Sequence, residues 1–169
     1  MSAELVTVLH TTDGRSAQKI FRCGQAPVPY QAGTMFTFER RNIRSLCEFA
    51  RYLAELEQNP TAFIIRGQPL PHVDASSIVY RRYRGDGAAF TPSLTQLVCV
   101  DVDNVEAPLG MSPCSDEAVE HVIRRLPAEF HNSSYVRQFS SSAGLSGQKV
   151  KVHLWWWFDR GYGDQELRR

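Results

Sequence analysis

Two aspartates, Asp101 and Asp103, close the apolar run Leu-Val-Cys-Val-Asp-Val-Asp at residues 97–103. A short apolar run of this kind is typical of a buried strand. Because side chains alternate across a strand, both carboxylates are expected on the same face. Clustered carboxylates repel each other, and divalent cations prefer such hard oxygen ligands, so the motif indicates a metal site. The alternative is that the strand simply ends there and both carboxylates are hydrated.

A second motif, Lys-Val-Lys-Val-His-Leu-Trp, occupies residues 149–155. Its period of two places Lys149, Lys151 and His153 on one face. Tryptophans at 155–157 follow at once, which favours a central, well-packed strand. A cationic row inside a sheet suits an anionic ligand, and a triphosphate is the obvious one. The alternative is an edge strand whose lysines face water and discourage aggregation.

A serine-rich loop, residues 140–144, precedes the second motif. Its hydroxyls, including those of Ser141 and Ser142, and its unhindered backbone N–H groups are suited to phosphate. A plain flexible turn explains the same composition equally well. A lone histidine is more often structural than a ligand, and it is the position of His153 beside Lys151 and after this loop that strengthens its case.

The chain has 169 residues, enough for one domain or two small modules. Its 19 Lys and Arg against 18 Asp and Glu exclude a globally basic coat but not a local basic groove. The sequence contains neither an apolar stretch long enough to span a bilayer nor a secretory signal, so we expect no membrane association. Its 4 scattered cysteines form no Cys-x-x-Cys pair, which argues against structural zinc and favours the reducing cytoplasm. Two of them, Cys47 and Cys99, lie in apolar patterns and are predicted to be small core residues.

Helical spacing predicts a helix over 43–58 capped by Asn42, and a second helix capped by Ser115 that stops at Pro127. Residues before about 33 give no clear pattern. Strands are predicted at 62–65, 77–83, 97–103, 135–139 and 149–158. A turn is expected at 159–163, followed by the start of a helix at 164–169.

If the two motif strands are neighbours in one sheet, the carboxylates and the cationic row face the same groove. Carboxylates hold divalent cations, the cations bridge phosphate oxygens, and cationic side chains neutralise the charge that builds up in the transition state. This equipment is typical of metal-assisted phosphoryl or nucleotidyl transfer.

The order of these motifs resembles the archaeo-eukaryotic primase superfamily, the primase-polymerases. The similarity rests on the strand ending in Asp101-Val102-Asp103, on the helix that follows, and on the strand carrying His153 before bulky apolar residues. The serine-rich lead-in looks most like plasmid- and phage-encoded members. The upstream segments 63–67 and 80–82 also look familiar in that setting, so the resemblance spans roughly residues 34–169.

The resemblance implies an α+β (α/β) fold, with an N-terminal α/β module packed on a catalytic sheet like that of an RNA-recognition motif. It implies a single primase-polymerase domain over 1–169, divided into an N-terminal module at 1–95 and part of the catalytic module at 96–169. The implied activity is template-directed nucleotidyl transfer from nucleoside triphosphates on single-stranded DNA, in replication of a plasmid, phage or similar element. A helicase or another replication domain is a further expected partner, C-terminal to this chain.

The resemblance also assigns roles to particular residues. Asp101 and Asp103 are expected to hold Mg²⁺ or Mn²⁺ in a two-metal site, and together with His153 they form the catalytic set. The expected nucleotide-binding residues are Lys149, Lys151, His153, Ser141, Ser142, Arg66 and Arg82.

The sequence departs from the family pattern in two places. A small hydroxyl residue is expected two positions before the histidine, where this chain has Lys151. The family's third motif, an apolar strand ending in another aspartate, is not found, because Asp159 and Asp164 lie in the predicted turn and at the predicted helix start. We therefore expect that the chain is truncated, that the third carboxylate lies beyond Arg169, and that this fragment binds metal and polymerises poorly.

Two other functions remain open. The first is a metal-dependent glycosyltransferase, in which an Asp-x-Asp motif holds Mn²⁺ and a nucleotide-sugar; the downstream Lys-x-His strand distinguishes a primase from it. The second is a replication-initiator or nucleic-acid-binding module that keeps the fold but has lost the third carboxylate.

Overall fold

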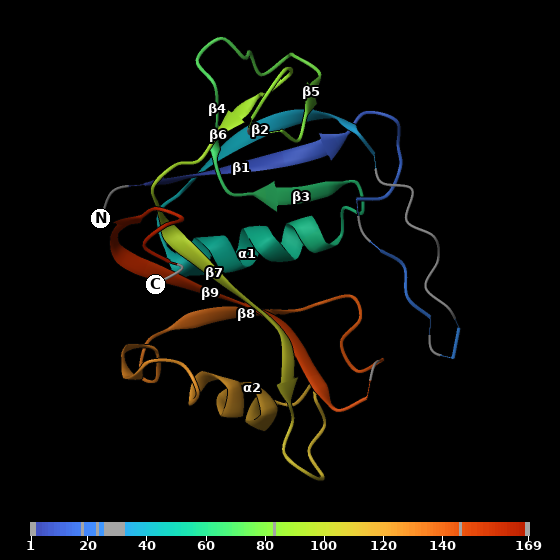
Figure 1. Ribbon diagram of the computed structural model, residues 1–169, viewed down its shortest axis with the longest axis vertical. Helices are drawn as coiled ribbons and strands as arrows, with labels where there is room; N and C mark the ends of the chain where they lie inside the picture. The colour runs from blue at the N-terminus through green and yellow to red at the C-terminus, as the bar shows by residue number, and fades with distance from the viewer. Residues whose placement is uncertain are drawn as a thin grey trace. The chain divides into compact units, whose positions relative to one another are not determined.

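The computed structural model describes residues 3–17, 19–22, 24–25, 33–82, 84–145 and 147–167. These residues form a mixed α+β fold with two α-helices and antiparallel sheets (Figure 1), as the sequence predicts at this level. The chain divides into two compact units. The first contains the described residues of Met1–Lys19, Pro29–Gln96 and Phe158–Arg169, and the second those of Ile20–Val28 and Leu97–Trp157.

The first unit is built on a sheet with the strand order β3-β1-β2-β5. Its antiparallel strands are β1 (Glu4–Thr11), β2 (Met35–Ile43), β3 (Ala62–Ile65) and β5 (Val79–Tyr80). Helix α1 (Leu46–Glu57) and a short pair, β4 (Gln68–Pro69) with β6 (Phe90–Thr91), complete this unit. Its core includes a cluster of buried side chains from these strands and from the residue before β6: Leu9, Phe36, Phe38, Ile65, Val79, Ala89 and Phe90.

Helix α1 begins three residues later than the sequence predicts. Asn42, the predicted cap, instead pairs with Leu5 in the β1–β2 ladder. The cap is Ser45, whose Oγ accepts a hydrogen bond from the Glu48 N–H at 3.1 Å. The Glu48 carboxylate in turn accepts one from the Arg44 N–H at 2.8 Å, so the first turn is satisfied from both sides.

The strand predictions for the first unit have mixed outcomes. The predicted strand at 62–65 is confirmed as β3. The strand predicted at 77–83 is confirmed only at Val79–Tyr80, because the chain then bends into the turn at Gly85 and Gly87, where φ is positive. Strands β1 and β2 lie where the sequence pattern predicted no strand.

The second unit contains a sheet with the order β7-β9-β8. Its elements are β7 (Thr95–Glu106), α2 (Asp116–Ile123), the 3₁₀ helix η1 (Ala128–Phe130), β8 (Tyr135–Phe139) and β9 (Lys149–Tyr162), and the first residues of β7 and the last of β9 belong to the first unit. Strands β8 and β9 pair antiparallel. The Ala107 N–H donates to Gln148 O near one end of β7, and the Gln96 side chain donates to Phe158 O near the other, so β7 and β9 also run antiparallel.

Strands β7 and β8 are therefore parallel to each other, with α2 connecting them along the chain and β9 inserted between them. This is a split β-α-β arrangement. The central position of β9 confirms the prediction made from its tryptophans, and it gives the second motif a neighbouring strand on each side.

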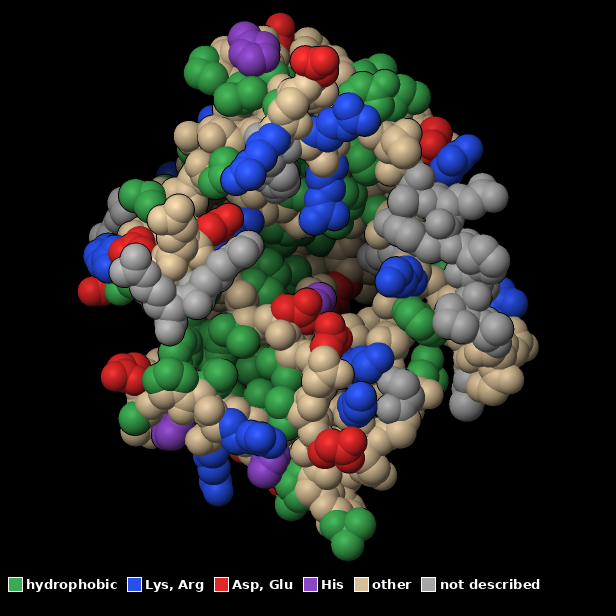
Figure 2. Space-filling view, in the orientation of Figure 1, with side chains coloured by type: hydrophobic (Ala, Val, Ile, Leu, Met, Phe, Trp, Pro, Cys, Tyr) green, Lys and Arg blue, Asp and Glu red, His purple; other side chains and the backbone are tan. Residues whose placement is uncertain are grey.

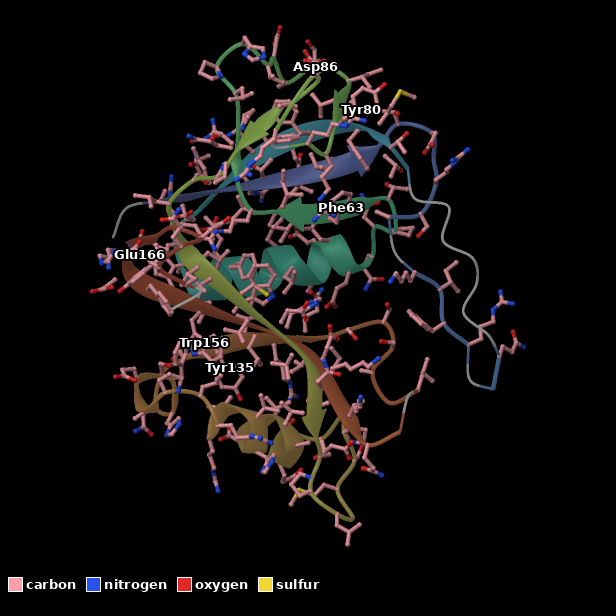
Figure 3. All side chains as sticks on the ribbon, viewed as in Figure 1. Phe63, Tyr80, Asp86, Tyr135, Trp156 and Glu166 are labelled. Carbon is pink, nitrogen blue, oxygen red and sulfur yellow. The ribbon has the colours of Figure 1, made fainter. Side chains whose placement is uncertain are left out.

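One face of β9 forms the core of the second unit. Val150, Val152 and Leu154 are fully buried, and Trp156 is 2% exposed. The Trp156 ring lies 4.8 Å from the Phe130 ring and 5.7 Å from the Tyr135 ring (Figure 3). Helix α2 adds a buried face to the same core, with Ala118, Val119, Val122 and Ile123. The alternation that buries these residues leaves Lys149, Lys151 and His153 on the opposite face.

The ends of several elements differ from the predictions. The strand at 97–103 is confirmed but continues to Glu106, and α2, capped by Ser115 as predicted, ends at Ile123 rather than near Pro127. Residues 159–162, predicted as a turn, extend β9. Residues 164–167 form turns rather than a helix, because the Gly163 N–H and the Arg160 guanidinium both bind the Glu166 carboxylate and hold it beside the strand end.

The prediction that two cysteines lie in the core is wrong. Cys47 and Cys99 are both exposed. Cys99 shares the alternation of Asp101 and therefore lies on the open face of β7, whereas the buried face of α1 carries Phe49, Tyr52 and Leu53. The described residues also include no helix with the length and apolar character needed to cross a membrane.

Candidate nucleotide and metal site

The acidic pair lies on the open face of β7. Asp101 and Asp103 are exposed, while Val102 between them is 7% exposed and faces the core. Both carboxylates therefore lie on one face of the sheet, as strand alternation requires. The side chain of Asp101 is 61% exposed, so water, rather than protein, supplies most of its solvation.

His153 brings the second motif to the acidic pair. Its Nε2 lies 3.4 Å from Oδ1 of Asp101, which is consistent with β9 lying next to β7 in the sheet. Figure 2 shows acidic, basic and histidine side chains gathered over these two strands. The carboxylates and the histidine, far apart in the sequence, thus occupy one face of one sheet.

Gln138 of β8 contacts the other side of the same imidazole. It pairs directly with His153 in the β8–β9 ladder, and its Oε1 lies 3.4 Å from Nδ1 of the ring. Sequence reasoning missed this residue, although strand 135–139 was predicted with the correct bounds. Finding Gln138 requires the register between the two strands, and no local pattern in the sequence encodes that register.

Lys151 is joined to the serine-rich loop by hydrogen bonds. The Lys151 Nζ donates to Ser142 Oγ at 3.2 Å, and the hydroxyls of Ser140 and Ser142 lie 3.3 Å apart. The Ser140 N–H donates to Lys151 O at 3.0 Å, so the turn that starts at Ser140 is tied to β9. Ser141 is exposed. The structure thus brings the predicted serine loop and Lys151 together.

Lys149 has a different partner from Lys151. Its Nζ donates to Asn104 Oδ1 at 3.4 Å, and Asn104 follows Asp103 in β7. This contact links the start of β9 to the strand that carries the carboxylates. The ammonium groups of Lys149 and Lys151 are available to an anion, because their present partners are neutral oxygens.

Arg66 and Arg82, the other two predicted nucleotide-binding residues, belong to the first unit. The Arg66 guanidinium donates to Tyr162 O at 2.6 Å and lies 3.1 Å from the Asp164 carboxylate. These contacts hold the last described turns against the end of β3.

Arg82 lies with its guanidinium 5.2 Å from the centre of the Tyr80 ring, and it donates to Asp86 O at 3.2 Å. Figure 3 labels Tyr80 and Asp86 on this part of the first unit. Both predicted arginines thus make defined contacts inside their own unit, and these contacts order the chain locally.

The pKa of Cys99 depends on the burial and charge of the open face of β7. Desolvation by the surrounding protein and, second, the negative charge of Asp101 raise the pKa of the Cys99 thiol to about 12. The thiol therefore stays protonated at neutral pH even though part of its surface is exposed, and a protonated thiol is a poor metal ligand and a poor nucleophile.

The donor set of this site fits a cation that arrives with phosphate. In the part of the chain that the structure describes, no group of three or more His, Cys, Asp and Glu residues is arranged to hold a metal ion. Mg²⁺ in nucleotide sites is commonly held by one or two carboxylates, with water and substrate phosphate oxygens completing the shell. Asp101 and Asp103 match that requirement, and the neighbouring lysines match the phosphate charge.

Comparisons with protein-family models, curated proteins and solved structures find no match to this chain. The functional argument therefore depends on the chemistry of the open face of β7 and β9. That face combines two carboxylates, an imidazole in contact with one of them, and two ammonium groups.

Proposed function

We propose that this chain is a DNA primase-polymerase domain of the archaeo-eukaryotic primase type, which transfers nucleotides from nucleoside triphosphates in a metal- and template-dependent reaction. The observation that carries this proposal is the 3.4 Å approach of His153 Nε2 to Asp101. Two motifs that the proposed chemistry needs at one centre meet on one face of one sheet.

The topology of the second unit supports the proposal. Its elements follow the chain order β7, α2, β8, β9, and its strands lie in the order β7-β9-β8. A sheet of the RNA-recognition-motif type begins with this split β-α-β arrangement. In the proposed fold, α2 covers one face of the sheet and the opposite face carries the reaction.

In this proposal Asp101 and Asp103 bind the Mg²⁺ or Mn²⁺ that accompanies the triphosphate. When bound, the cation offsets negative charge on the phosphates and polarises the phosphorus that is attacked. His153 donates a hydrogen bond from its ring to a phosphate oxygen, and Lys151, held by Ser142, places a positive charge nearby. Lys149 adds a second positive charge at the start of β9.

A template-extension assay tests the proposal. The full-length protein is incubated with single-stranded DNA, nucleoside triphosphates and Mn²⁺, with and without an annealed primer. The double variant D101N/D103N is expected to abolish extension, and D74N/D86N, which changes two exposed aspartates of the first unit, is expected to leave it unchanged. Equal extension by wild type and D101N/D103N, or no extension by wild type under any metal, contradicts the proposal.

A second candidate is a nucleic-acid-binding module with the same fold and no catalysis. It is favoured by the finding that the described residues contain no metal-binding group of three or more. Binding of single-stranded DNA that is independent of Mn²⁺ and of nucleotide, without extension, is the outcome this candidate predicts. His153→Ala separates the two further: in the primase proposal it weakens nucleotide binding more than template binding.

A further inference from the structure

Strand β5, at one edge of the first unit's sheet, is flanked by large exposed apolar side chains. Tyr80 is 43% exposed, and its direct partner in the β2–β5 ladder, Met35, is 41% exposed. Ile78, which precedes the strand, is 61% exposed, whereas Val79 between Ile78 and Tyr80 is buried in the core. A cluster of exposed apolar side chains is a common feature of binding surfaces.

The residues after Tyr80 carry an excess of positive charge. Arg81, Arg82 and Arg84 are all exposed, and three arginines with one aspartate, Asp86, give residues 81–87 a net charge of +2. In the part of the chain that the structure describes, none of the three guanidinium groups lies within ion-pair distance of a carboxylate. Figure 2 shows Lys and Arg side chains next to hydrophobic ones in the upper part of the view, where Figure 1 places β5. The charge of this segment is therefore available to an anionic partner.

Two of these arginines lie against aromatic rings. The Arg82 guanidinium is 5.2 Å from the centre of the Tyr80 ring, and the Arg81 guanidinium is 5.2 Å from the centre of the Phe63 ring. The two rings are labelled in Figure 3. Contact with a ring fixes the position of a guanidinium without neutralising its charge. Aromatic rings and guanidinium planes are also the two kinds of protein surface on which unstacked nucleobases stack.

The loop that carries the arginines is held at its base. The carbonyl oxygen of Arg82 accepts hydrogen bonds from the N–H groups of Ala89 and Phe90 at 3.2 and 3.3 Å. The Arg82 guanidinium donates to Asp86 O across the loop at 3.2 Å. These contacts order the loop before any partner binds, so that less conformational entropy is lost on binding.

We propose that this part of the first unit binds a single-stranded nucleic acid. The binding surface, called the β5 surface below, consists of Met35, Ile78, Tyr80, Arg81, Arg82 and Arg84. A single strand presents phosphates and the faces of unstacked bases together, which matches guanidinium groups beside an exposed ring. A duplex keeps the faces of its bases inside its own stack, and an acidic peptide supplies charge without planar groups, so neither makes use of Tyr80. The identification of this strand as the template rests on the proposed function, whereas the composition of the surface does not.

Photocrosslinking locates the contact without any substitution. The protein is irradiated with an oligothymidylate that contains one 5-iodouracil, without metal or nucleotide, and the crosslinked peptides are identified by mass spectrometry. We expect crosslinks in the segments that contain Tyr80 and Met35. Crosslinks confined to peptides outside residues 33–37 and 78–90 overturn the proposal.

Substitution of Tyr80 tests the stacking contact. Binding of a fluorescent oligothymidylate is followed by anisotropy, and Tyr80→Ala is expected to weaken it about tenfold, as loss of a stacked aromatic side chain commonly does. Tyr80→Phe, which keeps the ring, is expected to bind as wild type does. The affinity for a duplex of the same length is expected to be the same in Tyr80→Ala and wild type. Unchanged binding of the single strand by a folded Tyr80→Ala contradicts the proposal.

The dependence of affinity on salt tests the arginines. Each phosphate contact to a single strand contributes about 0.7 to the slope of log K against log salt concentration, so loss of three contacts is expected to reduce the slope by about 2. The test variant is R81Q/R82Q/R84Q, and the matched control, which removes the same charge from exposed arginines elsewhere in the first unit, is R40Q/R44Q/R51Q.

The control variant is expected to keep the wild-type slope. If the test variant does not fold, Arg84→Gln alone is measured, with an expected decrease of about 0.7. Equal slopes in the test and control variants mean that the charge effect is not localised, and they overturn the proposal. Competition by polyglutamate that is as strong as competition by unlabelled oligothymidylate indicates a general anion-binding surface and overturns the assignment to a single strand.

The template-extension assay tests the consequence for the proposed function. With the full-length protein, Tyr80→Ala is expected to raise the KM for the template about tenfold and to leave the KM for the nucleoside triphosphate unchanged. Equal template KM values in Tyr80→Ala and wild type contradict the identification of the bound strand as the template. If wild type shows no extension at all, the proposed function fails, while crosslinking and anisotropy still decide whether the β5 surface binds a single strand.

Discussion

The thiol of Cys99 allows the charge of the acidic pair to be measured in solution. Its pKa is raised from 9.0 to about 12, first by desolvation and second by the charge of Asp101. A change of this size lowers the thiolate fraction at neutral pH about a thousandfold. Because the thiolate is the form that reacts, alkylation of Cys99 is expected to be slower than that of an ordinary exposed thiol by a factor of this order.

The variant Asp101→Asn removes the negative charge that raises the pKa of Cys99 and leaves the desolvation that also raises it. Because the Asp101 side chain is 61% exposed, solvent screens its charge, and its effect on the neighbouring thiol is expected to be about 1 kcal/mol. This corresponds to roughly a fivefold faster alkylation of Cys99, which remains slow because desolvation persists.

The assay is alkylation by iodoacetamide at several pH values, followed by mass spectrometry that resolves each cysteine peptide. Cys114, which is exposed in the same unit, is the internal control, and its rate is expected to be the same in both proteins. An unchanged Cys99 rate in Asp101→Asn, or a wild-type Cys99 that reacts as fast as Cys114 at neutral pH, refutes the reasoning about the open face of β7.

Three further predictions concern stability. Leu154→Ala, at a fully buried position of β9, is expected to cost about 3 kcal/mol in urea unfolding, and a loss below about 1 kcal/mol contradicts the assignment of this face as core. Ser45→Ala removes the cap of α1 and is expected to cost about 1 kcal/mol, with Ser45→Asp restoring most of it. Burial and the hydrogen bond to Glu39 raise the pKa of Tyr52 above its usual value, so the folded state holds this proton more tightly than the unfolded state. That contribution is complete below the unfolded pKa and is lost as pH rises through the folded one, so wild type is expected to lose up to about 1.4 kcal/mol per pH unit above pH ~10 from this group. Tyr52→Phe lacks this loss, and identical alkaline profiles of the two proteins in urea unfolding contradict the prediction.

The second unit was the more predictable half of the chain because its signals are local. Strict alternation set β9 and the buried face that includes Leu154, and Ser115 with the acidic residues after it set the start of α2. The same alternation, applied to β7, also places Cys99 on the open face beside Asp101. The general tendency of cysteine to be buried predicts the opposite, and at this position the strand alternation prevails.

The first unit shows what local patterns leave out. Strand β2 carries Arg40, Arg41 and Asn42 near its end. This polar sequence does not show the apolar alternation typical of a strand, and the segment is a strand because it pairs with β1. Asn42 is a residue type typical of a helix cap, yet it pairs with Leu5 in the β1–β2 ladder. The cap of α1 is formed by Ser45 together with Glu48. These outcomes depend on contacts between distant segments, which single-sequence propensities do not contain.

The candidate site likewise depends partly on local sequence patterns and partly on contacts between distant segments. The types and spacing of Asp101, Asp103 and His153 predict that they face one groove if the two motif strands are neighbours, and the contact between His153 and Asp101 confirms that these two residues meet. Gln138 depends on how β8 aligns with β9, and a shift of one residue would turn its side chain to the opposite face. The sequence therefore specified the chemical groups, and the strand register specified which of them touch.

The central claim is that metal, nucleotide and His153 share one centre on the open face of β7 and β9. Paramagnetic broadening by Mn²⁺ in the presence of a non-hydrolysable nucleoside triphosphate tests it most directly. The ring signals of His153 are expected to broaden far more than those of His121, which lies on α2, and D101N/D103N is expected to abolish the effect. Sharp His153 signals at saturating Mn²⁺ and nucleotide, or equal broadening in the double variant, would contradict the account.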